Sequence, residues 1–305
     1  MRPVLVTGAS GFIGREVLGP LVAAGHDVHA VSRSEQPARD GVTWHAADLI
    51  ESAQVVREVR PEILVHLAWY AEPGNFWTST ENLRWVEASL ALLRTFVDAD
   101  GRRAVIAGTC AEYDWSQADG ALREDSTLLR PSTLYGAAKK GLHEVAEAFS
   151  AQAGLELAWG RIFFLYGSDE PRGRLFASVA RALLAGEPAR TTAGEQVRDF
   201  LHVSDVGAAF ASLAISEVTG AVNVGSGDGV ALRDLVAEIG LAAGRPELLN
   251  VGALPPREGE PPRLVADTRR LHDEVGFAPS LSLQEGIAVS VHELRSASGD
   301  EAAPD

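Results

Sequence analysis

Two residues of this sequence, a tyrosine and a lysine, have the types and spacing needed for acid–base chemistry. Tyr135 and Lys139 form a Y-x-x-x-K pattern at the start of a segment with helical periodicity. A separation of four residues places both side chains on one face of a helix. A phenol has a pKa of about 10 in water, and a neighbouring ammonium group favours the phenolate. We therefore predict that Lys139 tunes Tyr135 as a catalytic proton donor or acceptor.

A third candidate catalytic residue is the threonine that ends the apolar run 104–109. A hydroxyl at the carboxyl end of a buried parallel strand faces the ligand crevice of the sheet. Thr109 is therefore predicted to hold the substrate oxygen to which Tyr135 gives a proton. Glu112 follows three residues later and has two interpretations, a structural contact or a carboxylate that faces the substrate. Cys110 is interpreted as a packing residue.

A glycine-rich turn near the start of the chain is typical of a site for a dinucleotide. The apolar run 3–7 precedes the turn, whose sequence is T-G-x-x-G-x-x-G, and the helical segment 12–24 follows it. Glycine permits the tight turn and the close approach of a pyrophosphate, and the helix N-terminus supplies free N–H groups. The predicted cofactor contacts in this turn are Gly8, Ser10, Gly11, Phe12, Ile13 and Gly14.

The end of the second apolar run, 27–33, indicates which dinucleotide is bound. A carboxylate at this position binds a free ribose 2′-hydroxyl, whereas an arginine suits a 2′-phosphate. The run ends in Ser32 and Arg33, and the next acid is Glu35. The sequence therefore favours NADP(H), with NAD(H) as the alternative. His66, inside an apolar run, is interpreted as a core residue. Further predicted cofactor contacts are Asp48, Leu49, Leu67, Ala68, Tyr135 and Lys139.

Short apolar runs alternate with helical segments through the first half of the chain. The runs lie at 3–7, 27–33, 42–45, 63–68, 104–109 and 155–164. Runs that are apolar on both faces and separated by helices predict an α/β fold, a Rossmann-type doubly wound parallel sheet. From Tyr166 onward the sequence breaks into mixed pieces rich in Pro and Gly, which predicts a smaller C-terminal substrate-binding lobe.

The pattern also predicts how the chain is divided between these parts. The dinucleotide-binding Rossmann domain is expected to comprise residues 1–165, with 195–224 returning to it. Residues 166–194 and 225–296 form the predicted substrate-binding lobe. Residues 297–305, which end the chain in S-G-D-E-A-A-P-D, are predicted to be a flexible acidic tail.

The composition of the 305 residues is that of an ordinary globular protein, with 46% hydrophobic and 23% charged residues. A net charge of −15 argues against nucleic-acid binding, which needs a basic surface. No apolar run reaches the ~18 residues that a membrane helix needs, and the chain begins without a signal-peptide pattern. The single cysteine excludes an internal disulfide and a cysteine-based zinc site. We expect a cytoplasmic enzyme that binds no metal, membrane or nucleic acid.

Together these motifs resemble the extended short-chain dehydrogenase/reductases, the NAD-dependent epimerase/dehydratase family of nucleotide sugars. The resemblance extends from Val4 to about Leu294. It rests on the glycine-rich turn, the tyrosine–lysine pair, H-L-A at 66–68, T-C-A-E-Y at 109–113, R-D-F-L-H-V-S-D-V at 198–206, N-V-G-S-G at 223–227 and R-E-G-E at 257–260. The resemblance implies that Arg198 and Arg257 clamp the diphosphate of a nucleoside-diphosphate sugar, a role that suits the two-pronged guanidinium group.

Two departures from the family pattern narrow the predicted reaction. Family 4,6-dehydratases have an acidic residue two positions after the catalytic threonine, where this chain has Ala111, preceded by Cys110. Dehydration is therefore not expected. Phe164 stands where an asparagine is common in the family, which predicts an altered sugar pocket. The predicted substrate-binding residues are Glu112, Phe164, Arg198 and Arg257.

The sequence predicts an oxidoreductase of deoxysugar biosynthesis, an NADPH-dependent reductase of a nucleotide-linked keto-deoxysugar that acts at C4. A nucleotide-sugar 4-epimerase that retains NAD is the alternative enzyme, and a carboxylate in place of Ser32 and Arg33 would favour it. A non-catalytic NADP(H) sensor is the alternative of another class, and the intact Thr109, Tyr135 and Lys139 argue against it. Apolar stripes at 83–97 and 138–149, together with the resemblance, predict a homodimer.

Overall fold

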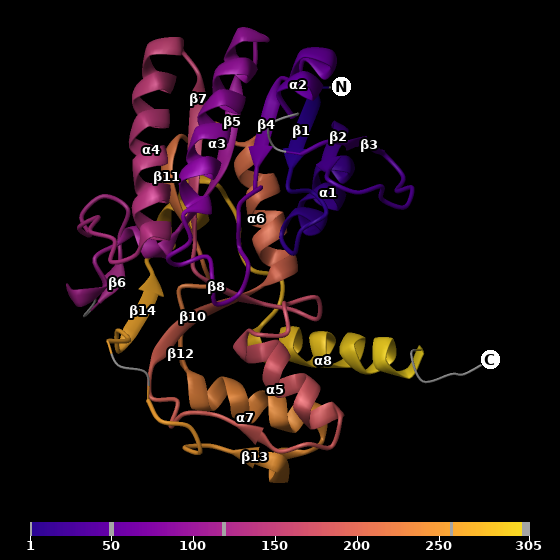
Figure 1. Cartoon of the computed structure of the whole chain (residues 1–305), viewed down its shortest axis with the longest axis vertical. Helices are drawn as coiled ribbons and strands as arrows, with labels where there is room; N and C mark the ends of the chain where they lie inside the picture. Colours follow the sequence, from indigo (N-terminus) through magenta and orange to yellow (C-terminus); the bar gives the residue numbers. More distant parts are fainter. Residues whose placement is uncertain (1, 49–51, 118–119, 257–258, 301–305) are drawn as a thin grey trace.

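Seven parallel strands form the central sheet of the protein (Figure 1). The computed structural model describes residues 2–48, 52–117, 120–256 and 259–300. The strand order is β11-β7-β5-β4-β1-β2-β3, and every neighbouring pair is parallel. The strands are β1 (Pro3–Thr7), β2 (Asp27–Ser32), β3 (Val42–Ala46), β4 (Ile63–His66), β5 (Arg103–Thr109), β7 (Glu156–Ile162) and β11 (Gly220–Val224). The predicted Rossmann-type α/β fold is confirmed.

Helices cover both faces of this sheet. One face carries α1 (Gly14–Ala23) and α6 (Val203–Ile215), and the other carries α2 (Ser52–Val59), α3 (Glu81–Asp98) and α4 (Leu134–Ala153). Alternate side chains of a strand point to opposite faces. In β1, Val4 and Val6 therefore lie in the core beneath α1 and α6, whereas Leu5 lies in the core beneath the other helices. The strand order reverses between β1 and β4, which is where open α/β sheets bind their ligands.

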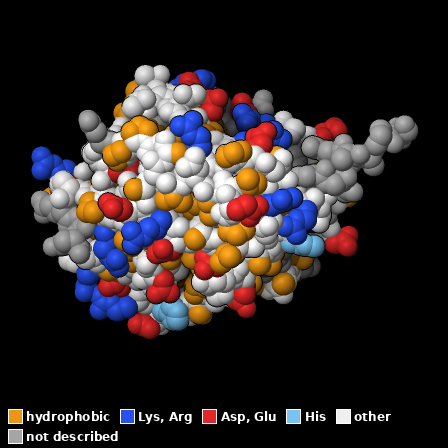
Figure 2. Space-filling view, turned by 90° about the horizontal axis from the view of Figure 1, so that it is seen from below, with side chains coloured by type: hydrophobic (Ala, Val, Ile, Leu, Met, Phe, Trp, Pro, Cys, Tyr) orange, Lys and Arg blue, Asp and Glu red, His pale blue; other side chains and the backbone are white. Residues whose placement is uncertain are grey.

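A second, smaller lobe lies below the central sheet in Figure 1. Its five-stranded sheet contains β6 (Ala121–Leu122), β8 (Phe164–Tyr166), β10 (Val197–His202), β12 (Gly229–Ala231) and β14 (Arg263–Ala266), and a separate ribbon pairs β9 (Ala189–Arg190) with β13 (Leu249–Asn250). Its helices are α5 (Leu175–Leu184), α7 (Leu232–Ala243) and α8 (Leu283–Asp300). Seen from below, the lobe mixes both signs of charge with apolar side chains (Figure 2). No helix within the described ranges is long and apolar enough to span a membrane.

Four short helical turns complete the described elements. They are the 3₁₀ turns η1 (Cys110–Glu112), η2 (Trp115–Gln117) and η3 (Pro246–Leu248), and the π-helical turn η4 (Arg270–Glu274). The first two follow β5 directly, so they lie at the carboxyl edge of the central sheet.

The sequence predicted one strand at 155–164. In the structure, the chain crosses from one lobe to the other inside this segment. β7 ends at Ile162, Phe163 donates its N–H to the carbonyl oxygen of Val224 at 3.0 Å, and β8 begins the other sheet at Phe164. The predicted return at 195–224 begins later, because β10 belongs to the second sheet and only α6 and β11 rejoin the first. Residues 297–300 of the predicted tail are helical in α8, and 301–305 lie outside the described residues.

Gly8 and Gly25 have similar positive φ angles, +70° and +81°, but different surroundings. A Cβ atom on Gly8 would lie 2.7 Å from the backbone nitrogen of Ala68, whereas one on Gly25 would meet no atom within 4 Å. We expect Gly25→Ala to lower the free energy of unfolding by about 1 kcal/mol, the cost of a left-handed backbone. Gly8→Ala should cost about 3 kcal/mol, because it adds a backbone clash, and it should weaken dinucleotide binding. Denaturant unfolding and cofactor titration measure both effects, and equal losses in the two variants would contradict this packing.

Candidate active site

The glycine-rich turn lies between β1 and α1, against the segment that follows β4. Gly11 donates its N–H to the carbonyl oxygen of Gly8 at 3.0 Å, and Leu67 donates its N–H to that of Thr7 at 3.2 Å. A Cβ atom on Gly14 would overlap the carbonyl oxygen of Gly8. The turn is therefore a narrow backbone cradle without side chains at these points, which fits a dinucleotide pyrophosphate. The structure brings together the residues predicted from both segments: Gly8, Ser10, Gly11, Phe12, Ile13, Gly14, Leu67 and Ala68.

The end of β2 lies beside this turn and presents hydroxyl groups and an arginine. Ser32 is buried, and its Oγ donates to Oγ of Ser10 at 3.0 Å. Gln36 donates from Nε2 to the same Ser32 oxygen at 3.2 Å. Arg33 is exposed, and its guanidinium group makes no hydrogen bond or ion pair with the described part of the chain. Such a group is available to bind an anion.

Thr109 ends β5 and Tyr135 lies in the first turn of α4, where the Thr109 hydroxyl is near enough to act on the phenol. Thr133 caps α4 by accepting the N–H of Gly136 at 3.1 Å, which fixes where the helix begins. The N–H of Ala111 donates to Oγ1 of Thr109 at 3.2 Å and orients that hydroxyl. Burial raises the pKa of Tyr135 to about 12, and the Thr109 hydroxyl acts in the lowering direction. At neutral pH the phenol is therefore protonated and held beside a second hydroxyl.

Lys139 lies one helical turn after Tyr135, with its side chain buried. Its Nζ donates to the carbonyl oxygen of Ala107 at 2.7 Å and lies 3.7 Å from the ring centre of Trp69. A cation in this position is attracted by the negative face of the indole. Burial lowers the pKa of Lys139 to about 7, and the charge of Glu112 acts in the opposite direction. The spacing of four residues places the lysine one helical turn from the tyrosine, but its hydrogen bond goes to the backbone of β5, and its tuning of Tyr135 stays a prediction.

Three aromatic side chains from the segment between β4 and α3 surround the ring of Tyr135. The ring centres of Trp69, Phe76 and Trp77 lie 6.5, 4.9 and 5.7 Å from that of Tyr135, and each pair is edge-to-face. We call these three residues the aromatic wall. The N–H of Tyr135 also donates to the carbonyl oxygen of Trp77 at 3.1 Å. Sequence reasoning missed the wall, although the dense aromatic residues at 69–77 were a signal for it.

Arg174, at the start of α5, is a further residue that sequence reasoning missed. Burial is the main influence on the pKa of Tyr135, but the Arg174 charge is near enough to act in the lowering direction. The Arg174 side chain is half-buried and forms no hydrogen bond or ion pair with other described side chains. It adds a positive charge to the surroundings of the tyrosine.

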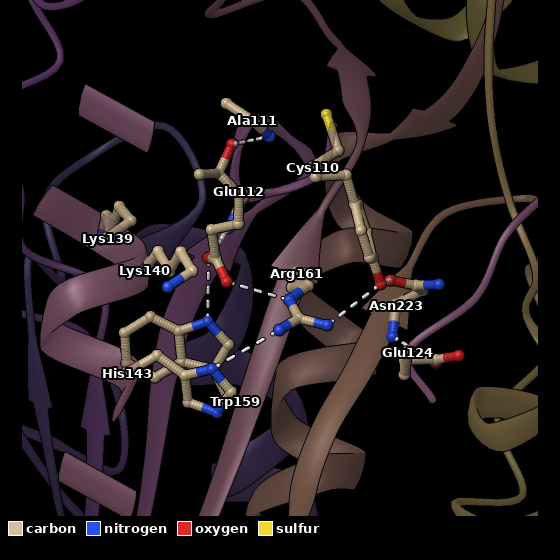
Figure 3. A network of polar contacts seen from close by, with 12 residues as sticks. Cys110, Ala111, Glu112, Glu124, Lys139, Lys140, His143, Trp159, Arg161 and Asn223 are labelled. Atoms are coloured by element: carbon tan, nitrogen blue, oxygen red, sulfur yellow. Dashed lines mark hydrogen bonds and ion pairs between the residues drawn. The ribbon is translucent and has the colours of Figure 1, made fainter. Parts of the chain in front are cut away.

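Glu112 belongs to a buried polar network behind Thr109 (Figure 3). The side chains of Glu112 and Arg161 are 0% and 1% exposed. Arg161 donates from Nε to Oε2 of Glu112 at 2.9 Å. The backbone N–H of Thr109 and the indole N–H of Trp159 donate to Oε1, each at 2.9 Å. The interpretation of Glu112 as a substrate-binding carboxylate is therefore wrong, because both of its oxygens are engaged inside the protein.

Arg198, the predicted diphosphate ligand in β10, lies in the second lobe. It donates from Nη1 to the carbonyl oxygen of Val197 at 2.9 Å, and its Nη2 lies 4.0 Å from a carboxylate oxygen of Glu260. Its guanidinium carbon lies 5.5 Å from the ring centre of Phe164 in β8. The structure thus brings together two of the predicted substrate-binding residues.

The remaining predicted residues are a core histidine and three ligand contacts. His66 is buried, and burial lowers its pKa to about 3, so it is a neutral core residue as the sequence predicted. Asp48 is exposed after β3, and its carbonyl oxygen accepts the N–H of Ser52 at 2.9 Å. Its contact with adenine stays a prediction. Leu49 and Arg257 lie outside the described residues.

Comparison with known proteins decides the family. Residues 4–225 match the family described as the NAD dependent epimerase/dehydratase family. The chain belongs to this family. The predicted resemblance is therefore confirmed, and with it an enzyme class that uses a nicotinamide cofactor.

Relatives across this family carry different activities. A UDP-glucose 4-epimerase of Azospirillum brasilense is 28% identical over 94% of this chain and 90% of its own. A 3-diazoavenalumate denitrifying reductase of a Streptomyces species is 33% identical over 72% of this chain and 75% of its own. The structure of MoeE5 in complex with UDP-glucose and NAD is 31% identical, covers 97% of this chain and 99% of its own, and superposes with a TM-score of 0.82.

The buried ion pair makes a prediction about stability. Glu112→Ala leaves the guanidinium of Arg161 buried without its counter-charge, and we expect a loss of about 3–5 kcal/mol in the free energy of unfolding. Glu144→Ala is the matched control, because Glu144 forms an exposed pair with Lys140 on α4, and it should cost less than about 1 kcal/mol. Denaturant unfolding monitored by circular dichroism compares the two, and similar small losses would show that the buried pair is not structural.

Proposed function

We propose that the protein is an NADPH-dependent reductase of a nucleotide-linked keto-deoxysugar, acting at C4. The proposal rests on one observation. Among the described residues, Tyr135 is the one candidate proton donor beside the end of β5. Ala111 has no acidic group, and Glu112 is engaged in its ion pair. Burial raises the pKa of the Cys110 thiol to about 12. Elimination of water needs a second acid, whereas reduction of a carbonyl needs a single proton donor.

The mechanism uses the protein's own hydroxyl and ammonium groups around one carbonyl. When bound, the dihydronicotinamide supplies the hydride. The O–H of Tyr135 donates its proton to the carbonyl oxygen as negative charge develops there, and the hydroxyl of Thr109 donates a second hydrogen bond to that oxygen. Burial lowers the pKa of Lys139 to about 7 and the charge of Glu112 opposes this; in its ammonium form Lys139 stabilises the phenolate that remains on Tyr135.

Binding of the nucleotide is assigned to arginines from the second lobe. The diphosphate is dianionic, and a chain with a net charge of −15 must offer local positive charge to hold it. Arg198 lies over Phe164, and Arg174 lies nearer to Tyr135. Arg257 completes the proposed clamp from outside the described residues. The UDP-sugars named for several relatives support a nucleoside-diphosphate substrate.

The rival enzyme is a nucleotide-sugar 4-epimerase, which would use the same tyrosine and threonine on a retained NAD. The 4-epimerases among the relatives favour it. Arg33, which is exposed and unpaired among the described residues, and the absence of a carboxylate at Ser32 favour a cofactor with a 2′-phosphate that is exchanged in each turnover. A non-catalytic sensor has no need of the set Thr109, Tyr135 and Lys139. We also propose a homodimer through α3 and α4, which expose Leu83 and Val145.

The reaction is tested by incubating the protein with NADPH and nucleoside-diphosphate 4-keto-6-deoxyhexoses. We expect NADPH to be consumed and the product to gain two hydrogen atoms by mass. Tyr135→Phe should lower turnover by ~10² or more, in line with a lost general acid, without changing the affinity for NADPH. Tyr70→Phe is the control, since its hydroxyl is engaged with Glu72, and it should retain turnover. Interconversion of two nucleotide hexoses without net NADPH consumption would establish the epimerase instead.

Cofactor choice is tested at Arg33. NADPH should bind more tightly than NADH, because Arg33 pairs with the 2′-phosphate. Arg33→Asp should remove or reverse this preference, and Arg233→Asp on α7, which makes the same change of charge in the second lobe, should leave it intact. Fluorescence titration of each cofactor gives the dissociation constants. Equal constants for both cofactors in the unmodified protein would exclude a role for Arg33 in selection.

A further inference from the structure

We propose that Trp77, supported by Phe76 and Trp115, is a specificity-determining residue that selects a sugar without an oxygen at C6. In this assignment the C5–C6 edge of a 6-deoxyhexose packs on the aromatic wall while its C4 carbonyl meets Tyr135. The inference rests on the proposed function and names the sugar and the residue that recognises it.

The wall packs against the ring that carries the reacting hydroxyl. Trp77 crosses the ring of Tyr135 at 89° with centres 5.7 Å apart, and Phe76 crosses it at 85°. Trp77 also meets Trp115 edge-to-face, with ring centres 6.1 Å apart. Phe76 is buried, whereas Trp77 and Trp115 are half-buried and keep part of their rings accessible. The surface offered to a ligand beside Tyr135 is therefore mainly indole.

Hydrogen bonds fix this segment in place. Asn82, buried in α3, donates from Nδ2 to the carbonyl oxygen of Phe76 at 2.7 Å and accepts the indole N–H of Trp69 at 2.9 Å. The carbonyl oxygen of Trp77 accepts the N–H of Tyr135 at 3.1 Å. These hydrogen bonds therefore position both the aromatic wall and Tyr135. A rigid aromatic surface discriminates by shape and polarity because it cannot turn a polar group toward the ligand.

The chemistry of a 4-keto sugar then decides which of its edges faces the wall. C4 is bonded to C3 and C5, so one of these carbons must lie toward the wall when the carbonyl oxygen reaches Tyr135. A hydroxyl placed on the rings of Phe76 and Trp77 would lose its water and find no acceptor, since phenyl has no polar group and indole offers one N–H. C5 carries hydrogen and C6, and a C6 methyl group packs on indole without that loss.

Trp115, which contacts Trp77 of the wall, also connects the wall to the residues around Arg198. Trp115 and Phe164 both pack against the same small cluster of buried side chains: Cys110, Tyr113, Leu122, Phe163, Leu264 and Ala266. The Arg198 guanidinium lies over the ring of Phe164. In a ligand that extends from Tyr135 to Arg198, the sugar would therefore contact the aromatic rings and the diphosphate would contact the guanidinium group.

The test compares stable ligand pairs that differ only at C6: UDP-glucose with UDP-6-deoxyglucose, and dTDP-glucose with dTDP-6-deoxyglucose. Calorimetric titration of the NADP⁺-loaded protein gives each dissociation constant. We expect the 6-deoxy member of at least one pair to bind at least ~10-fold more tightly, the size of effect that a hydrophobic pocket gives for one small group. Trp77→Ala should bring this ratio close to one, and Trp77→Phe, which keeps an aromatic ring, should retain part of it.

Trp85→Leu is the matched control. Trp85 is a half-buried indole on α3 whose ring contact is with Trp69 at 6.3 Å and which is thus separated from Tyr135 by that ring, so its loss should leave the ratio unchanged. Equal binding of both members by the unmodified protein, or an equal fall of the ratio in Trp85→Leu, overturns the inference and leaves the proposed function standing. Binding of an aromatic carboxylate such as p-coumarate, with no binding of any nucleotide sugar, overturns both.

Discussion

The carboxylate of Glu112 and the guanidinium group of Arg161 are buried together behind Thr109. Their hydrogen bonds link the end of β5 to the neighbouring strands. Each charge would be costly to bury alone, so Glu112 and Arg161 depend on each other. The second oxygen of Glu112 binds the backbone N–H of Thr109, which sets the reacting hydroxyl at the end of β5. Arg161 donates to the hydroxyl of Tyr113 at 3.1 Å, and that hydroxyl donates to Asn223 at 2.8 Å. The network therefore runs from the active site through β7 to β11 (Figure 3).

Asn223 carries the network across to the second lobe. Its side-chain nitrogen donates to the carbonyl oxygens of Leu122 at 2.8 Å and Asp267 at 3.1 Å, and its backbone N–H donates to Glu124. Leu122 lies in β6, which pairs with β14 of the second sheet. The lobe that carries Arg198 is thus aligned with the strand that carries Thr109 by hydrogen bonds between buried groups. Such groups have few alternative partners, so the alignment is well determined.

The parts of the site that could be predicted from sequence are those set by local geometry. Spacing along a helix places Tyr135 and Lys139 together, and the carboxyl ends of parallel strands place Thr109 near the glycine-rich turn. The partner of Glu112 could not be predicted in this way, since Arg161 lies 49 residues further along the chain. The break at Phe163 was missed because an apolar run has the same pattern on both sides of it. The aromatic wall depends on a segment without regular periodicity, so no rule of spacing placed it against Tyr135.

The crossing at Phe163 limits how the two lobes can move. A hinge needs residues outside regular structure that can absorb a large change of φ and ψ. Phe163 is a single residue between two hydrogen-bonded strands, and its own N–H is bonded to Val224. At the next crossing His202 ends β10 and caps α6, which begins at Val203. With no spare chain at these two crossings, neither can serve as a hinge, and any rotation of one lobe against the other would have to be absorbed at longer connections such as residues 225–228 between β11 and β12.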